Sequence, residues 1–413
     1  MSTIVSIAGG SGSNNILTQY PMLTDAFGRV RVSQPLTLFD SSHRYADNGL
    51  WSTLSTNGGT ATFSPNEGLV DLSVNGANGS QVLRETTKVF SYQPGKSLLV
   101  FNTFVMAPAQ TGLRQRVGYF GIDNGIYIEL RDDILSFVER SIVTGSLTEN
   151  SVPQAAWNAD TMDGNGPSGI TLDITKAQIL FMDIEWLGEG TVRLGFVIDG
   201  NFIVCHRFNH ANLITSTYIT TASLPLRYEI SAGVAGIVAT LKQVCSTVIS
   251  EGGYELRGLQ QAVGTPITSA RALATAGTLY PMVSIRLKST RLDGIVVATA
   301  ISIIGNTSAN YNWQVVAAGT TTGGSWVSAG ANSSVEYNLT GTSFAGGRII
   351  ASGYFTATAS TSVSVDILRA ALLATQLERD GLTGTTYEFS LILTAGTNTE
   401  TAFASMDWEE ISR

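Results

Sequence analysis

The chain has 413 residues, of which only 14% are charged and 43 are glycine. An average soluble domain is about 25% charged, so this composition excludes disorder driven by high charge and also a long coiled coil. The net charge of −8 gives no basic footprint, so nucleic acid is not an expected partner. At about 150 residues per domain, the length predicts two or three domains.

The first residues of the chain lack the features of a signal peptide. Residues 1–10 contain no basic residue and only a short apolar run, whereas a signal peptide needs a positive segment followed by a longer apolar one. No apolar stretch reaches the roughly 18 residues that a membrane helix needs. We therefore expect neither an export signal nor a membrane span.

Residues 1–34 are expected to form an extended N-terminal arm. The arm begins with a stretch rich in Gly, Ser and Asn and ends in an alternation that suits one short strand. A segment with so few apolar residues cannot build its own core, so it must lie on another surface, of the same chain or of a neighbouring subunit. The residues expected to anchor the arm are Phe27, Arg29, Arg31 and Val32.

Residues 35–250 show the pattern of an antiparallel sandwich or jelly roll. Short apolar or alternating runs are separated by turn residues such as Asp123-Asn124-Gly125 and Asp199-Gly200-Asn201. The clearest predicted strands are 98–106, 119–122, 126–130, 134–138, 179–186, 192–198 and 202–208. Regular spacing of short strands with such turns is typical of all-β sandwiches.

A second β-rich unit is expected at residues 281–413. Gly252 and Gly253 mark the domain boundary, and residues 251–280 are expected to form a linker that contains a connecting strand at 251–261. The predicted strands of the second unit are 282–288, 292–304, 311–317, 334–339, 348–356, 387–394 and 405–410.

One short helix is predicted in the C-terminal domain. Ser364 or Asp366 can cap it, apolar residues recur near helical spacing up to Leu377, and Gly381 closes it. The predicted fold is therefore all-β, with two antiparallel β-sandwich or jelly-roll domains, an extended N-terminal arm and this one helix.

The two cysteines and three histidines give one zinc-like pattern. Cys205, His206 and His210 are residue types that bind zinc. However, neighbouring residues of a strand point to opposite faces, and no fourth ligand is recognisable nearby. We expect no metal site and two free thiols, while a bridge between Cys205 and Cys245 stays open.

Two further groups have residue types found in catalytic or metal-binding sites, but they lack the surrounding sequence that such sites need. Ser41 and His43 could join an Asp in a triad, but no nucleophile elbow places the serine. Asp160 and Asp163 lie among glycines as in a calcium loop, yet the twelfth position is Thr171 and no flanking helix is expected. A surface turn is the favoured interpretation, and calcium binding by Asp160 and Asp163 stays open.

The best enzymatic hint is the pair Asp183 and Glu185 beside Trp186. At i, i+2 spacing on a regular strand, the two carboxylates would share one face of a sheet, as the carboxylates of jelly-roll glucanases do. The same alternation is ordinary for any sandwich strand. We therefore expect no catalytic or cofactor-binding residues and no cofactor.

Three separate segments resemble one family of proteins. They are the stretch from Thr24 to Trp51, the stretch from Trp186 to Ile230 with Gly195-Phe196-Val197 and Leu224-Pro225-Leu226-Arg227-Tyr228, and Arg291-Leu292-Asp293-Gly294-Ile295 with Asn312-Trp313. The segments resemble a family of virion structural proteins of tailed bacteriophages, many of them from marine and environmental samples. The resemblance touches both predicted domains and supplies no catalytic residue.

The resemblance implies a non-enzymatic part of a phage particle that assembles in the host cytoplasm. Its expected partners are other virion proteins and copies of itself, as a trimer or higher homo-oligomer, with the arm as its anchor. A tail-associated position in a baseplate, fibre or appendage is favoured over a capsid decoration or cement protein. The alternative is a lectin-like sandwich that recognises host-surface glycan, for which the proposed contacts are Trp51, Trp157 and Tyr254.

Overall fold

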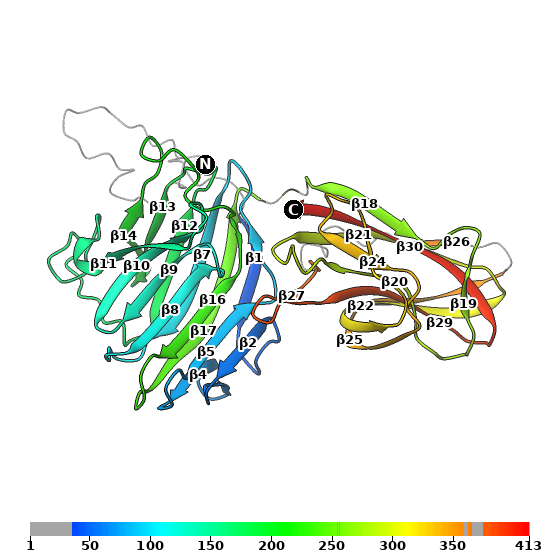
Figure 1. Ribbon diagram of the computed structural model, residues 1–413, viewed down its shortest axis with the longest axis horizontal. Coiled ribbons are helices and arrows are strands. Elements are labelled where there is room, and N and C mark those ends of the chain that lie inside the picture. Colours follow the sequence, from blue (N-terminus) through cyan, green and yellow to red (C-terminus); the bar gives the residue numbers. More distant parts are fainter. Residues whose placement is uncertain (1–34, 254, 256, 359–361, 366–374, 413) are drawn as a thin grey trace, which may run out of the picture.

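A computed structural model describes residues 35–253, 255, 257–358, 362–365 and 375–412 (Figure 1). In these residues nearly all regular structure is antiparallel strand, and the only helix is the 3₁₀ turn η2 (Gln154–Ala156). The strands form two sandwiches that lie next to each other as separate lobes (Figure 1). The all-β prediction is therefore confirmed. The predicted arm, with Phe27, Arg29, Arg31 and Val32, lies outside the described residues.

The N-terminal sandwich has an eight-stranded and a seven-stranded sheet. The first follows the order β14 (Asn201–Phe208), β13 (Val192–Ile198), β12 (Gln178–Ile184), β7 (Ser97–Val105), β17 (Val238–Glu251), β4 (Leu69–Asn75) and β3 (Thr60–Ser64), and β1 (Pro35–Ser42) also pairs with β17. The second follows the order β11 (Thr148–Pro153), β10 (Ile134–Ser141), β9 (Gly125–Arg131), β8 (Leu113–Phe120), β16 (Leu226–Ala232), β5 (Gln81–Thr86) and β2 (Trp51–Thr56). A small ladder of β6 (Phe90–Ser91) and β15 (Ser223–Leu224) lies beside them.

Alternation along the strands builds the core between the two sheets. On β8 the side chains of Leu113, Val117 and Tyr119 enter the main hydrophobic cluster. The alternate residues Arg114, Arg116 and Gly118 face away from the core, because successive side chains of a strand point to opposite sides. We use "outer face" for this second side of the seven-stranded sheet.

The tight turns follow from residues that accept positive φ. β13 and β14 are joined through Asp199 and Gly200, whose φ angles are 50° and 77°, and Ile198 pairs with Asn201 across the turn. Positive φ at both central positions is the requirement of the two-residue hairpin turn whose twist matches the strands. The hairpin predicted here is confirmed.

The C-terminal sandwich packs a five-stranded sheet on a six-stranded sheet. The first contains β18 (Leu259–Gly264), β30 (Glu400–Ser412), β21 (Ile295–Gly305) and β26 (Ser362–Val365) in order, with β19 (Arg271–Leu273) also on β30. The second contains β23 (Val327–Ser328), β24 (Val335–Asn338), β20 (Tyr280–Leu287), β29 (Glu388–Ala395), β22 (Ala309–Thr322) and β25 (Ser343–Ala357). Trp313, Met406 and Trp408 are among its buried core residues.

The linker between the lobes is shorter than predicted. β17 ends at Glu251, and β18 begins at Leu259, which pairs with Glu410 of β30. β18 and β19 therefore belong to the C-terminal sandwich, and only residues 252–258 connect the domains. The prediction of a linker over 251–280 was wrong because the short, polar β18 and the three-residue β19 carry no alternating apolar pattern of their own.

The predicted helix does not fit the described residues at its ends. Ser364 lies in β26, where it pairs with Ser302, and Leu377 donates its N–H to the carbonyl of Val296. Residues 366–374 lie outside the described part of the chain. In the described residues, no helix is long and apolar enough to cross a membrane.

Candidate functional site

A short hairpin of the C-terminal sandwich holds the two domains together. It consists of β27 (Arg379–Asp380) and β28 (Thr385–Thr386), and β27 lies between the two lobes (Figure 1). Arg379 donates its backbone N–H to Thr87 O at 2.9 Å and its Nη1 to Thr86 O at 2.8 Å. Gln376 Nε2 donates to Val89 O at 3.1 Å. The hairpin thus binds the backbone just after β5.

A buried carboxylate lies at the centre of this junction. Glu85, 1% exposed, accepts from Arg379 at 2.8 Å and from Arg227 Nε at 2.9 Å. Both guanidinium groups are themselves buried. Asp293 Oδ1, on an exposed side chain, lies 3.6 Å from Arg379 Nη2. Glu85 therefore compensates one cation from each domain.

Gly381 keeps the space next to Glu85 open. A Cβ at this position would overlap Glu85 Oε1 and come within 2.8 Å of the Arg379 guanidinium, so any other residue would displace one of these two groups. Its φ is not among the positive values that a C-terminal helix cap requires. The predicted role of Gly381 as a helix cap was wrong, and its role is close approach.

We expect Gly381→Ala to destabilise the protein by about 1–3 kcal/mol, the usual cost of overpacking a filled site. The matched control is Gly330→Ala, because a Cβ there meets its nearest atom at an ordinary 3.9 Å. Urea unfolding of both variants checks this. Equal midpoints for both variants would show that the carboxylate can move aside freely.

Three arginines surround two buried aromatic rings on the outer face. Phe120 and Tyr127, neither of them exposed, have ring centroids 4.5 Å apart. Arg116 and Arg140 each lie 5.5–5.8 Å from both rings, and Arg227 lies 5.3 Å from Phe120. Guanidinium groups at this range are attracted to the ring faces.

Carboxylates neutralise these arginines. Glu149 accepts from Arg140 Nη2 at 2.6 Å and from Tyr127 Oη at 2.8 Å, and Glu229 accepts from Arg116. Burial opposes ionisation of Glu149, but the hydrogen bonds from Arg140 and Tyr127 lower its pKa to about 2. Burial is the main reason that the pKa of Tyr127 rises to about 12. At neutral pH the outer face is a compensated charge network that continues through Arg227 to Glu85.

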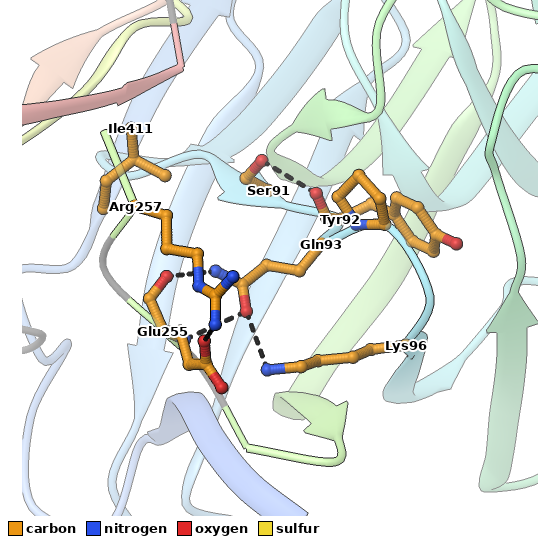
Figure 2. A pocket seen from close by; sticks show the side chains of 8 residues that line it. Ser91, Tyr92, Gln93, Lys96, Glu255, Arg257 and Ile411 are labelled. Carbon is orange, nitrogen blue, oxygen red and sulfur yellow. Dashed lines mark hydrogen bonds and ion pairs between the residues drawn. The ribbon is translucent and has the colours of Figure 1, made fainter. Parts of the chain in front are cut away.

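A cavity of about 460 Å³ lies beside the linker at the same junction (Figure 2). Its walls come from residues 91–96 of the N-terminal sandwich, from the linker and from Ile411 of β30. A second, narrower apolar seam between the domains is lined by Leu38, Phe90, Ile295 and Val297. The domains therefore meet through apolar as well as charged contacts.

The polar groups of the cavity hold the linker in place. Gln93 Oε1 accepts from the N–H of Glu255 at 3.0 Å and from Lys96 Nζ at 3.1 Å, as Figure 2 shows. Lys96 also donates to Gly253 O at 3.1 Å, and Glu255 pairs with Arg257. These bonds attach the linker to the N-terminal sandwich, so the cavity walls serve to fix the domain connection.

The tryptophans predicted as glycan contacts are core residues. Trp51 is 6% exposed, donates its Nε1–H to Ser41 Oγ and packs edge-on against Tyr228. Trp157 is 5% exposed and stacks on Phe137 at 4.4 Å. Neither ring can stack on a sugar, so this prediction was wrong for both; Tyr254 lies outside the described residues.

The predicted carboxylate pair is not arranged as a catalytic pair. Asp183 is fully buried and ion-paired with Arg193. β12 ends at Ile184, so Glu185 lies beyond the strand, and its side chain accepts the N–H of Thr191 at 3.3 Å. The regular strand that would place both carboxylates on one face does not extend that far.

The polar residues considered as a triad or a zinc site have separate partners. Ser41 Oγ accepts from Asn48 and Trp51, whereas His43 Nδ1 lies 3.9 Å from Asp47. The cysteines are free thiols, and Cys205 contacts Met162. His206 accepts from the N–H of Asn158 at 3.3 Å, and His210 Nε2 lies 2.6 Å from Glu139.

The two aspartates of the calcium-like loop bond to their own turns. Asp160 accepts from the backbone N–H groups of Met162 and Ser168, and Asp163 accepts from that of Asn165. Such local bonds are what turn aspartates usually make. The described residues contain no group of three or more His, Cys, Asp or Glu side chains placed to hold a metal.

The charge network at the junction was not predicted from the sequence. The signal was present as charged residues at alternate positions inside apolar strands, such as Arg227 and Glu229 within β16 and Arg114 and Arg116 within β8. The partner Arg379 carried no such signal, because it lies in a two-residue strand far along the chain.

The fold and the junction define a two-domain antiparallel β-sandwich protein with a buried ionic connection between the domains. No protein-family model and no curated protein sequence matches the chain. Among solved structures, it is similar to the CBM2 module of the evolved Dit of Lactobacillus casei BL23 phage J-1, at 8% identity and a TM-score of 0.34 over 54% of this chain and 99% of that one. It is also similar to the lectin UEA-II, solved with galactose, at 11% identity and a TM-score of 0.34 over 52% and 98%.

A third similar structure is a GH16 protein from the Bacteroides ovatus mixed linkage glucan PUL, solved with a product. Its identity is 8% and its TM-score 0.35, over 51% of this chain and 99% of that one. At these identities and scores, the comparisons carry no argument about ligand, activity or partner.

Proposed function

We propose that this chain is a non-enzymatic structural component of a tailed-bacteriophage particle, present in several copies and attached through residues 1–34. A tail-associated position is proposed over a capsid decoration role. The observation that carries the proposal is the domain junction, in which Glu85 binds Arg227 of its own domain and Arg379 of the other.

The junction supports a structural role because it makes one body out of two sandwiches. Domains of one chain usually move relative to each other unless their interface is extensive. Here, a backbone hydrogen bond, two side-chain hydrogen bonds to the backbone, a buried ion pair and an anchored linker all join the two domains. A part that fixes distances within a particle needs such rigidity. The resemblance of three sequence segments to phage virion proteins supports the same proposal.

Mass spectrometry of purified particles of a phage that encodes this chain tests the proposal. We expect its peptides in intact particles in amounts that correspond to several copies per particle. Absence of the chain from particles in which other structural proteins are detected would contradict the proposal.

Deletion of residues 1–34 separates folding from attachment. We expect the shortened protein to give the same thermal unfolding transition as the full chain, because both sandwiches begin at or after β1 (Pro35–Ser42). Particles assembled with the shortened chain should lack it when they are analysed by gel electrophoresis. Normal incorporation would show that another surface makes the attachment.

A further inference from the structure

β25 leaves one edge of the C-terminal sandwich unpaired in the described chain. It is the longest described strand, with 15 residues, and it ends the six-stranded sheet. One side pairs with β22 along its full length, from Ala309 opposite Ala357 to Thr322 opposite Ser343. No strand in the described ranges pairs with the other side, so its N–H and C=O groups offer a template for a further strand.

β25 also lacks the features that usually protect an edge. Among the other edge strands, β11 carries Glu149 and Pro153 and β14 carries Arg207. The edge strands β2, β3 and β18 lack proline and charge as β25 does, but they are only five or six residues long. Proline and charge are common protections against edge-to-edge pairing. Arg348 is the only charged residue of β25, and it is paired with Glu378 of its own chain.

Apolar side chains of β25 stand exposed or half-buried on both sides of the sheet. Tyr354 is 84% exposed and Ile349 55% exposed. Phe355 stacks on the core residue Tyr311 with centroids 4.9 Å apart, yet it is only half-buried. Side chains of one added strand would pack beside Tyr354 on one face and beside Phe355 on the other.

Tyr354 is the central position of the regular part of the edge. Gly346 and Gly347 have positive φ, and the register shifts between Ile349 and Ala351, which leaves residues 351–357 as an even, uncharged segment. In an antiparallel pair of two such segments centred on Tyr354, each tyrosine faces its counterpart. Aromatic pairs directly opposite each other stabilise antiparallel strands, and no like charges meet.

We propose that β25 pairs antiparallel with β25 of a second copy of this chain, about a two-fold axis at Tyr354. The pairing extends the six-stranded sheet across the two molecules. This interface can be tested on the purified protein. Its test is therefore independent of whether the chain is part of a phage particle.

Light scattering coupled to size-exclusion chromatography tests the pairing on the full chain. We expect the wild type to have twice the monomer mass at high concentration, and Tyr354→Lys to have the monomer mass, because two lysines would then lie opposite each other. The matched control is Tyr45→Lys, which changes a tyrosine that is 87% exposed on the other domain and should leave the dimer intact. A monomeric wild type, or a Tyr354→Lys variant that still dimerises, would overturn the proposal.

A covalent test checks the geometry. Opposed residues of an antiparallel pair have Cα atoms about 4.5–5.5 Å apart, within disulfide range, so Tyr354→Cys should form a covalent dimer on mild oxidation, whereas Tyr45→Cys should not. Equal cross-linking of the two variants would contradict the pairing. Binding of a soluble glycan that is lost in Tyr354→Ala, with a monomeric wild type, would assign the exposed ring to a sugar and also overturn it.

Discussion

Replacing Glu85 by Gln is expected to destabilise the protein by about 3–5 kcal/mol, the usual cost of leaving a buried charge without its partner. Glu85 is 1% exposed and lies between Arg227 and Arg379. The amide removes the one negative charge that both guanidinium groups contact, so Arg227 loses its ion pair and Arg379 keeps only Asp293, 3.6 Å away. Because the two arginines come from different domains, the junction should weaken together with the N-terminal sandwich.

Urea unfolding gives the free energy, and limited proteolysis at residues 252–258 reports on the junction. We expect the Glu85→Gln linker to be cut faster than the wild-type linker. The matched control is Glu67→Gln, which removes a carboxylate that pairs with Lys242 on the surface and should change neither measurement. Wild-type stability and cleavage in Glu85→Gln would show that the ion pair does not hold the domains.

Acidification from pH 6.5 to pH 4 is expected to remove about 3 kcal/mol of stability through His43 alone. His43 is 1% exposed, and its pKa is lowered to about 4 by burial and by Arg84, with Asp47 acting against them. Between pH 6.5 and pH 4, His43 therefore binds a proton in the unfolded chain but not in the folded chain. Its contribution to the free energy of unfolding is complete above pH 6.5 and decreases as the pH falls. His206, whose pKa burial and Arg207 also lower to about 4, acts in the same direction.

Single variants isolate the histidine contribution from that of the carboxyl groups. His43→Gln should reduce the loss of unfolding free energy between pH 6.5 and pH 4 relative to wild type. His210→Gln should increase it: although burial opposes the shift, the hydrogen bond to Glu139 raises the pKa of His210, so this residue stabilises the fold at lower pH and loses that effect as pH rises. Identical pH profiles for wild type and His43→Gln would contradict this assignment.

The strands and the N-terminal fold could be predicted because local chemistry determines them. Asp199 and Gly200 are turn residues on any surface, and the apolar runs of β12, β13 and β14 have the length and spacing of sandwich strands. The linker boundary could not be predicted, because β18 is held in its sheet by pairing with β30. The paired residues, such as Leu259 and Glu410, are far apart in the sequence.

The candidate site depended on contacts that no local pattern contains. Glu85 and Arg379 are separated by most of the sequence, and they meet because a short hairpin reaches the other lobe. Trp51 and Trp157 were predicted as ligand contacts from residue type alone, but the partners that bury them, Tyr228 and Phe137, come from other strands. Exposure of an aromatic ring is a property of the folded molecule, and for this reason Tyr354 was missed.

A cryo-EM reconstruction of a phage particle that encodes this chain tests the proposed function most directly. We expect density for two adjoining β sandwiches in repeated copies on the tail, with the junction around Glu85 and Arg379 unchanged between copies. A complete reconstruction of the particle in which every density is explained by other proteins would contradict it.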